Sequence, residues 1–336
     1  MIAGIGGASL GSEVQKCLSL CQRNAVFGCD ISPEAYGHFL NGIEKTYVVD
    51  KSKYVEDVIE VCLEANATFL VPGGEEPMFL LGEATEQLTS NNITLLGNSR
   101  KIISLFSNKC DTFNTLASLG FVVPKTQVVN SEKSIEHVGL PCIIKPSTDS
   151  GGSTNVFFAT SIDEAFMYSQ YIQMGGGTAL AQEYISAKEG EFTIGVLSLP
   201  TTEVVGAIAL QRSLKSKLSL SYNSRGGIIS SGYSQGYIGQ FENLCSQACT
   251  IAKHIESVGP INIQGRVRDG VLIPFEINPR FSASTYLRAM AGFNEVQMLI
   301  DYYNTGETPK QPKITYGWYL RSLTEQYVES IGSRDG

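Results

Sequence analysis

The sequence of 336 residues has little of what marks a membrane, secreted or nucleic-acid-binding protein. No apolar run approaches the roughly 20 residues that a membrane-spanning helix needs. The 25 Lys and Arg residues are outnumbered by 33 Asp and Glu and form no basic patch, which argues against non-specific binding to nucleic acid. The amino terminus also lacks the charged segment that opens a secretory signal peptide. We therefore expect a cytoplasmic protein whose partners are small molecules, with no nucleic acid and no membrane among them.

The sequence is also poor in the features of a disulfide-stabilised protein. Its 8 cysteines are scattered through apolar segments, which is typical of a reducing compartment. Two pairs, Cys17 with Cys21 and Cys245 with Cys249, are spaced one helical turn apart. Too few other ligands lie near them for a metal site, so we interpret them as small buried residues. A globular chain of this length predicts two or three structural units.

The first hundred residues alternate between short apolar strands and helical patterns. The helix-like segments include residues 55–65, and the strand-like segments are 2–5, 25–29, 46–49, 67–71 and 93–96. Alternation of this kind predicts a parallel, doubly wound, Rossmann-like sheet over residues 1–98. Glu75 and Glu76 follow the fourth strand, where such sheets place ligand-facing loops. They either hold a substrate amine or belong to a solvated loop.

The turn after the first strand contains part of a dinucleotide-binding motif. Gly4 and Gly6 with Gly7, followed by Asp30 after the second strand, fit an NAD site, but Ser9 stands where the motif has its third small residue. The alternative is a tight strand-to-helix turn that requires glycine. An NAD-dependent enzyme built on this domain therefore stays open as one interpretation.

A buried strand in the middle of the chain ends at Lys145 and leads into a loop rich in small and hydroxyl residues. The loop, Ser147 to Ser153, includes Ser150, Gly151 and Gly152. Its many N–H and O–H donors suit phosphate oxygens, although the lysine precedes the glycines and the loop is not a Walker loop. A plain linker is the alternative. A lysine at the base of the loop favours an anion.

The next two segments have the composition of a nucleoside site. The strand 179–185 ends in Gln182, Glu183, Tyr184 and Ile185, and a second strand covers 188–197. An acid, backbone donors and acceptors and an aliphatic wall can recognise adenine, and Glu191 can accept ribose hydroxyls. An exposed hairpin edge would have the same composition.

A strand over 202–210 then leads into the polar segments 211–217 and 221–227, which we interpret as a flexible loop that closes over a ligand. Arg212 and Arg225 are candidates for phosphate or substrate contacts. Solvated arginines are the alternative.

The most informative stretch is 259–284. Asp269-Gly270 between two apolar runs predicts a hairpin of strands 261–268 and 271–277. Glu276 and Asn278 then share one face, and Gln264 on the partner strand joins them. Oxygen ligands of this kind suit Mg²⁺, with Arg280 placed to contact a phosphoryl group. The alternative is the polar face of an ordinary hairpin.

Taken in this order, these segments resemble the ATP-grasp superfamily, and more narrowly a stand-alone relative of the ATP-binding unit of the carbamoyl-phosphate synthetase large subunit. The resemblance covers roughly residues 1–300 and is strongest at 259–264 and 276–280. It implies an N-terminal domain followed by a two-subdomain ATP-grasp fold, that is, an α/β protein whose ATP-binding part is α+β. The implied units are 1–98, subdomain A at 99–185, subdomain B at 186–305 and a tail at 306–336.

The resemblance also implies a role for each site residue. The implied cofactors are ATP and two Mg²⁺ ions, which Mn²⁺ can replace. Gln264, Glu276 and Asn278 match the metal-ligand positions, although Gln264 stands where many ATP-grasp enzymes have an acid. The remaining roles are a phosphate contact for Lys109 and Lys145, the phosphate loop for 147–153, adenine binding for Glu183 and Ile185, ribose binding for Glu191, and charge stabilisation for Arg280.

The implied chemistry is ligation of a carboxylate to an amine. The γ-phosphoryl group of ATP is transferred to the acid, and the amine attacks the resulting acyl phosphate, with Arg280, Lys145 and Arg212 as candidate catalytic residues. Candidate substrate contacts are Glu75, Glu76, Arg225, Ser282 and Ser284. With one ATP unit, no second copy and no glutaminase, we do not expect this chain alone to make carbamoyl phosphate.

The alternatives are an ATP-binding subunit or sensor without chemistry, and the NAD-dependent enzyme. A homodimer through the N-terminal domain is plausible, and the tail around 318–321 is expected to add an edge strand.

Overall fold

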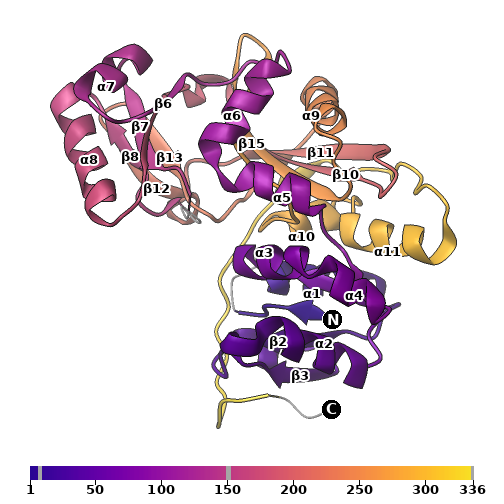
Figure 1. Cartoon of the computed structure of the whole chain (residues 1–336). Helices are drawn as coiled ribbons and strands as arrows, with labels where there is room; N and C mark the ends of the chain where they lie inside the picture. The colour runs from indigo at the N-terminus through magenta and orange to yellow at the C-terminus, as the bar shows by residue number, and fades with distance from the viewer. Residues whose placement is uncertain (7–9, 149–152, 334–336) are drawn as a thin grey trace.

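The computed structural model describes residues 1–6, 10–148 and 153–333, and these residues form three units, each built on a sheet (Figure 1). The N-terminal unit is a five-stranded parallel sheet with the order β3-β2-β1-β4-β5. Its strands are β1 (Ile2–Ala3), β2 (Phe27–Asp30), β3 (Lys45–Val48), β4 (Phe69–Pro72) and β5 (Thr94–Leu95). Its helices are α1 (Leu10–Cys21), α2 (Tyr54–Glu64), α3 (Glu75–Glu83) and α4 (Thr85–Ser90), with short 3-10 turns η1 (Tyr36–Phe39) and η2 (Lys51–Lys53). The predicted doubly wound sheet is confirmed.

One local prediction in this unit needs correction. Glu75 and Glu76 do not lie in a loop, because helix α3 begins at Glu75 directly after the extended residue Gly74. Acidic side chains in the first turn of a helix are favoured by the positive end of the helix dipole. The helix therefore holds both carboxylates at the carboxyl edge of the parallel sheet.

The second unit is a four-stranded antiparallel sheet with the order β6-β9-β7-β8. Its strands are β6 (Thr126–Val128), β7 (Cys142–Pro146), β8 (Phe157–Ala159) and β9 (Ala179–Glu183). Helices α7 (Glu132–Val138) and α8 (Ile162–Met174) pack against the sheet and form its own small core with residues such as Ile135, Ile144 and Ala165. Because the helices and the core cover one face of this sheet, its other face is left for a ligand.

The third unit is a six-stranded antiparallel sheet with the order β16-β15-β10-β11-β14-β17. Its strands are β10 (Glu191–Ser198), β11 (Val204–Arg212), β14 (Gly236–Ile238), β15 (Pro260–Arg268), β16 (Val271–Asn278) and β17 (Gly317–Tyr319). Asp269 and Gly270 both have positive φ, 53° and 74°, which is the two-residue hairpin turn that the sequence predicts. The predicted edge strand of the tail is β17.

Helices cover both faces of the six-stranded sheet. On one face, α5 (Arg100–Ser107), α6 (Lys109–Ser118) and α9 (Glu242–His254) bury a core that includes Ile194, Ile251 and Ile263. On the other face, α10 (Thr285–Met290) and α11 (Glu295–Thr305) share a core with α1 of the N-terminal unit. The tail then runs back along the N-terminal unit, as Figure 1 shows. The N-terminal unit and the six-stranded unit are thus joined by apolar packing, and none of the described helices is long and apolar enough to span a bilayer.

The segment 211–227 differs from the flexible loop that we predicted. Strand β11 continues to Arg212, the turn η5 (Lys217–Ser219) follows, and β12 (Leu220–Ser224) pairs with β13 (Gly227–Ser230). Arg225 and Gly226 form the turn between these strands with positive φ, 50° and 83°. A further short element, η4 (Ala187–Glu189), precedes β10.

Candidate functional site

The hairpin of β15 and β16 brings the three predicted metal ligands together. Gln264 lies directly opposite Glu276, and Asn278 donates from Nδ2 to Oε1 of Glu276 at 3.2 Å. A bulge after Gln264 leaves Phe275 as the extra residue of β16 and keeps Glu276 aligned with Gln264. One carboxylate and two amide oxygens fit Mg²⁺, which takes oxygen ligands and keeps open positions for phosphate and water. Within the described residues, no group of three or more His, Cys, Asp or Glu side chains offers another metal site.

Arg212 lies behind the metal-ligand hairpin and is not solvated. Its Nη1 donates to Oε1 of Gln264 at 3.1 Å, and its Nη2 donates to the carbonyl oxygens of Ser231 and Tyr233. Only 5% of the residue is exposed, and burial lowers its pKa while the nearby Glu191 carboxylate raises it. The arginine therefore orients the amide of Gln264, and one of the two lone pairs of that oxygen stays available for a cation.

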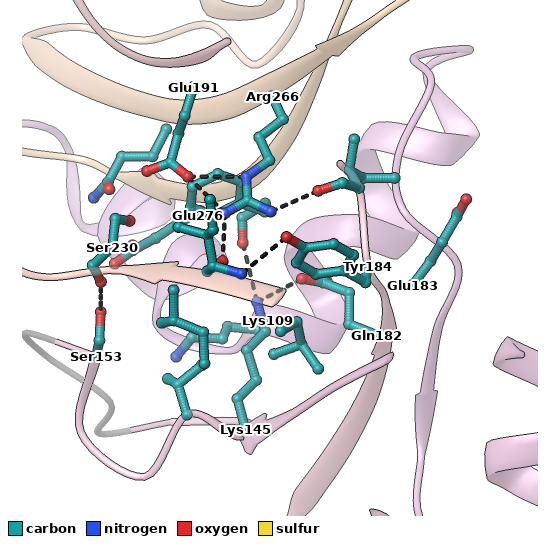
Figure 2. A pocket seen from close by; sticks show the side chains of 17 residues that line it. Lys109, Lys145, Ser153, Gln182, Glu183, Tyr184, Glu191, Ser230, Arg266 and Glu276 are labelled. Carbon is teal, nitrogen blue, oxygen red and sulfur yellow. Dashed lines mark hydrogen bonds and ion pairs between the residues drawn. The ribbon is translucent and has the colours of Figure 1, made fainter. Parts of the chain in front are cut away.

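Two lysines converge on the same cavity from different units (Figure 2). Lys145, at the end of β7, donates from Nζ to Oε1 of Gln182 at 2.8 Å and to the carbonyl oxygen of Phe275 at 3.1 Å. Lys109 begins α6, and its backbone N–H donates to the carbonyl oxygen of Ser147 at 3.0 Å. The pKa of Lys145 is lowered to about 7, mainly by burial and also by the positive charge of Lys109, while Glu276 opposes both effects. A bound anion would restore the charged form of this lysine.

The phosphate-loop prediction falls partly outside the described residues. Ser150, Gly151 and Gly152 lie outside them. Ser147 is buried and Ser153 borders the cavity, where its Oγ donates to the carbonyl oxygen of Ser230 at 2.7 Å. The two described ends of the loop therefore lie beside the lysines.

One end of the cavity is lined by the segment that the sequence predicts to bind a nucleoside. Gln182, Glu183, Tyr184 and Ile185 all line it. The Glu183 carboxylate accepts from Nη1 of Arg268 at 2.6 Å, and the Tyr184 hydroxyl accepts from the backbone N–H of Ile228 at 2.9 Å. Backbone groups and aliphatic side chains are thus what this end of the cavity presents to a base.

Arg266 is the residue that the sequence reasoning missed. Its Nε donates to Glu191 at 2.9 Å, and its Nη1 and Nη2 donate to the carbonyl oxygens of Ile185 and Ile228, each at 2.6 Å. The guanidinium also lies over the Tyr184 ring, 5.0 Å from its centroid. The sequence offered one signal for it: Arg266 lies two residues after Gln264 in the same predicted strand and so on the same face. A charge buried there requires partners. Glu191, predicted to bind ribose, has one carboxylate oxygen occupied by this arginine.

A second cavity of about 280 Å³ adjoins the first and shares Ser153, Gln264 and Glu276 with it. It is bounded by three predicted substrate residues, Glu75, Ser282 and Ser284, and by the predicted catalytic residue Arg280. Nη2 of Arg280 donates to Oε1 of Glu75 at 2.7 Å, and Ser282 and Ser284 are hydrogen-bonded to each other through their hydroxyls at 2.8 Å. The Glu276 carboxylate therefore lies at the boundary of both cavities, of which the second has the more polar lining.

Two of the predicted substrate residues lie elsewhere. Arg225 is largely exposed and forms an ion pair with Glu164 of α8 at 2.5 Å. Glu76 is exposed and pairs with Lys51 at 3.2 Å beside a separate cavity of the N-terminal sheet. Neither side chain borders the two adjoining cavities.

Comparison with known proteins agrees with this geometry. A family model described as the ATP-grasp domain matches residues 106–284, which is more than half of the chain. The carbamoyl phosphate synthase large chain of Neisseria meningitidis serogroup B is 23% identical over 234 residues, which cover 68% of this chain and 21% of that protein. The chain thus spans about a fifth of the length of this relative.

Solved structures are similar over almost the whole chain. A biotin carboxylase of Campylobacter jejuni in complex with β-γ-ATP has a TM-score of 0.69 and 14% identity, and covers 93% of this chain and 73% of that one. The L-amino acid ligase of Bacillus licheniformis has a TM-score of 0.65 and 16% identity, with 90% and 72% covered. Identities this low show a shared fold.

Proposed function

The chain belongs to the ATP-grasp family, and from this membership we propose that it is an ATP-dependent carboxylate–amine ligase that forms an acyl phosphate and releases ADP and phosphate. The observation that carries the proposal is the continuity of the two cavities at Glu276 and Gln264. A nucleotide in the first cavity would direct its terminal phosphate toward the second cavity, where Arg280 would lie beside the acceptor. This is the arrangement that phosphoryl transfer requires.

The proposed reaction has two steps, phosphoryl transfer to the acid and attack of the amine. A carboxylate oxygen of the acceptor forms a bond to the γ-phosphorus as the bond from that phosphorus to the bridging oxygen breaks, and ADP leaves. A neutral amine then attacks the acyl carbon, the carbon–oxygen bond to phosphate breaks, and the amine proton passes to the departing phosphate or to water. The product is an amide.

The protein contributes positioning and charge in this mechanism. Lys109 and Lys145 hold the phosphates, and Arg280 stabilises charge on the transferred group. Arg212 acts through Gln264, whose amide oxygen it orients. Gln264, Glu276 and Asn278 would hold Mg²⁺, or Mn²⁺ in its place, which neutralises phosphate charge when bound. We propose that these three side chains would hold two ions.

The decisive experiment measures ADP formation with MgATP against a panel of acids and amines, added singly and in pairs. We expect ADP release that depends on one acid and rises with one amine. Lys145→Ala and Glu276→Ala should abolish it, whereas Lys101→Ala should not, because Lys101 is exposed and pairs with Glu256, which lies just beyond the end of α9. Undiminished release from the first two variants would refute the proposed site.

A binding subunit or sensor without chemistry is the second interpretation, and it predicts tight ATP binding without turnover across the panel. An NAD-dependent enzyme is not favoured, because both oxygens of the Asp30 carboxylate accept backbone N–H hydrogen bonds, one from Ile5 after β1 and one from Ser32. Calorimetry with NAD tests that reading directly.

A further inference from the structure

The second cavity, which the proposed function makes the site of the acceptor and which we call the acceptor cavity, has an unusual charge pattern for a site that receives a carboxylate. Among the described residues that line it, the charged ones are Glu75, Glu276 and Arg280. Glu276 faces Gln264 and Asn278 in the proposed metal site. Glu75 is therefore a second carboxylate that the phosphoryl transfer itself does not need.

Glu75 and Arg280 come from different units and meet at this cavity. Glu75 is the first residue of α3, and Arg280 follows β16, 205 positions later in the chain. Their ion pair of 2.7 Å is partly open, with 41% of the Glu75 side chain and 19% of the Arg280 side chain exposed. Nη1 of Arg280 donates to the carbonyl oxygen of Phe281, which holds the guanidinium in place. An ion pair with this exposure adds little stability and can be exchanged for ligand contacts.

The Glu75–Arg280 pair would favour an amino acid over an acid that carries only a carboxylate. A plain carboxylate on Arg280 would lie against the Glu75 carboxylate and be repelled by it. An α-amino acid carries an ammonium group two bonds from its carboxyl carbon. Such a zwitterion can place its carboxylate on Arg280 and its ammonium on Glu75, so that both protein charges keep an opposite partner.

The rest of the cavity indicates what side chain the ligand carries. Apart from the apolar Leu10, the uncharged part of its wall is made of small and polar residues, namely Gly73, Gly74, Ser153, Thr193, Ser231, Gly232, Ser234, Asn262, Gln264, Ser282, Ala283 and Ser284. Arg288 lies beneath this wall, but its charge is compensated by Glu295 at 2.5 Å and by hydrogen bonds to Asn262 and Ser284. Among the described residues, hydroxyl and amide groups and no further unpaired charge therefore line most of the wall.

We propose that the acid substrate is an α-amino acid with a small, uncharged, polar side chain, recognised through its ammonium by Glu75 and through its carboxylate by Arg280. The identity of the cavity as the acceptor site rests on the proposed function. Recognition of the amino acid does not depend on turnover, and it is measured separately from ADP release.

The experiment uses calorimetry of the full chain with Mg²⁺ and a non-hydrolysable ATP analogue. The ligands are L-serine, L-threonine, L-asparagine and L-glutamine, followed by the des-amino and decarboxylated counterparts of the tightest binder. We expect each counterpart to bind about 10- to 100-fold more weakly, as the loss of one charge-assisted contact implies. Glu75→Gln should weaken the amino acid by a similar factor and leave the des-amino acid unchanged or tighter.

Glu83→Gln is the matched control, since Glu83 also lies on α3 and pairs with an arginine, Arg100, at 2.6 Å. It should bind the amino acid like the unchanged chain, and unfolding midpoints of both variants establish that they fold. Equal binding of the amino acid and its des-amino counterpart, or equal binding by Glu75→Gln and Glu83→Gln, would overturn the inference. Amino acid binding that depends on Glu75 but gives no ADP with MgATP and any amine would support the inference and refute the proposed ligase activity.

Discussion

The buried lysine of the phosphate site should make ATP binding depend on pH. The pKa of Lys145 is about 7, well below the ordinary value of 10.5, because burial disfavours its charged form. At pH 8 about a tenth of the free protein would therefore carry the charge. Phosphate oxygens bind the charged form, so binding must take up a proton at this pH.

The expected magnitude follows from this linkage. The dissociation constant of MgATP should be nearly constant below pH 7 and rise by up to about tenfold per pH unit from pH 7 to 9. Calorimetry in buffers of different ionisation enthalpy should detect close to one proton taken up at pH 8. Lys145→Gln should bind weakly with no such slope, and Lys145→Arg should lose the slope because arginine stays charged.

Stability of the free protein should change in the opposite sense. Between pH 7 and the ordinary pKa of 10.5 the unfolded chain binds the proton that folded Lys145 has lost. The free energy of unfolding should therefore rise with pH across this window, by up to about 1.4 kcal/mol per unit, relative to Lys145→Gln. ATP affinity that is flat from pH 6 to 9, or that has the same slope in Lys145→Gln, would refute the reasoning.

The remaining predictions concern the hairpin and the tail. Glu276→Gln should weaken Mg²⁺-dependent ATP binding by roughly 10- to 100-fold, measured by titration with Mg²⁺, because it removes the single carboxylate of the metal site. Arg266→Ala should lower the unfolding free energy by about 3–5 kcal/mol in denaturant, because it removes the hydrogen-bonded partner of the buried Glu191 carboxylate and leaves it only Arg212, 3.6 Å away. The exposed Arg268→Ala should cost under about 1 kcal/mol. Arg321→Ala should raise the KM of the acid and leave that of ATP unchanged, because Arg321 joins Glu13 to the carbonyl oxygens of the acceptor-cavity wall; equal effects on both would contradict this role.

Much of the fold and part of the candidate site could be predicted from local pattern. The Asp269-Gly270 turn predicts the hairpin, and the alternation of strand side chains places Glu276 and Asn278 on one face. An unbroken two-residue hairpin would pair Gln264 with Phe275, so the bulge that aligns Gln264 with Glu276 is a feature that only the structure shows. The strand and helix alternation of residues 1–98 similarly determines a parallel sheet, because each βα unit carries its own signals. Apart from the bulge, these features depend on the turn residues and side-chain alternation within short segments, so they can be predicted without the tertiary structure.

Only the tertiary structure decided which charges meet. Lys145 reaches the carbonyl oxygen of Phe275, 130 positions away, and Glu75 reaches Arg280 across 205 positions. Arg266, which no local pattern distinguishes from an exposed strand arginine, is buried among groups from three separate strands and turns. Pairings of this kind depend on how whole sheets pack. The sequence by itself therefore determined the metal-ligand hairpin and the family, whereas the packing of the units determined the lowered pKa of Lys145 and the charge pattern of the acceptor cavity.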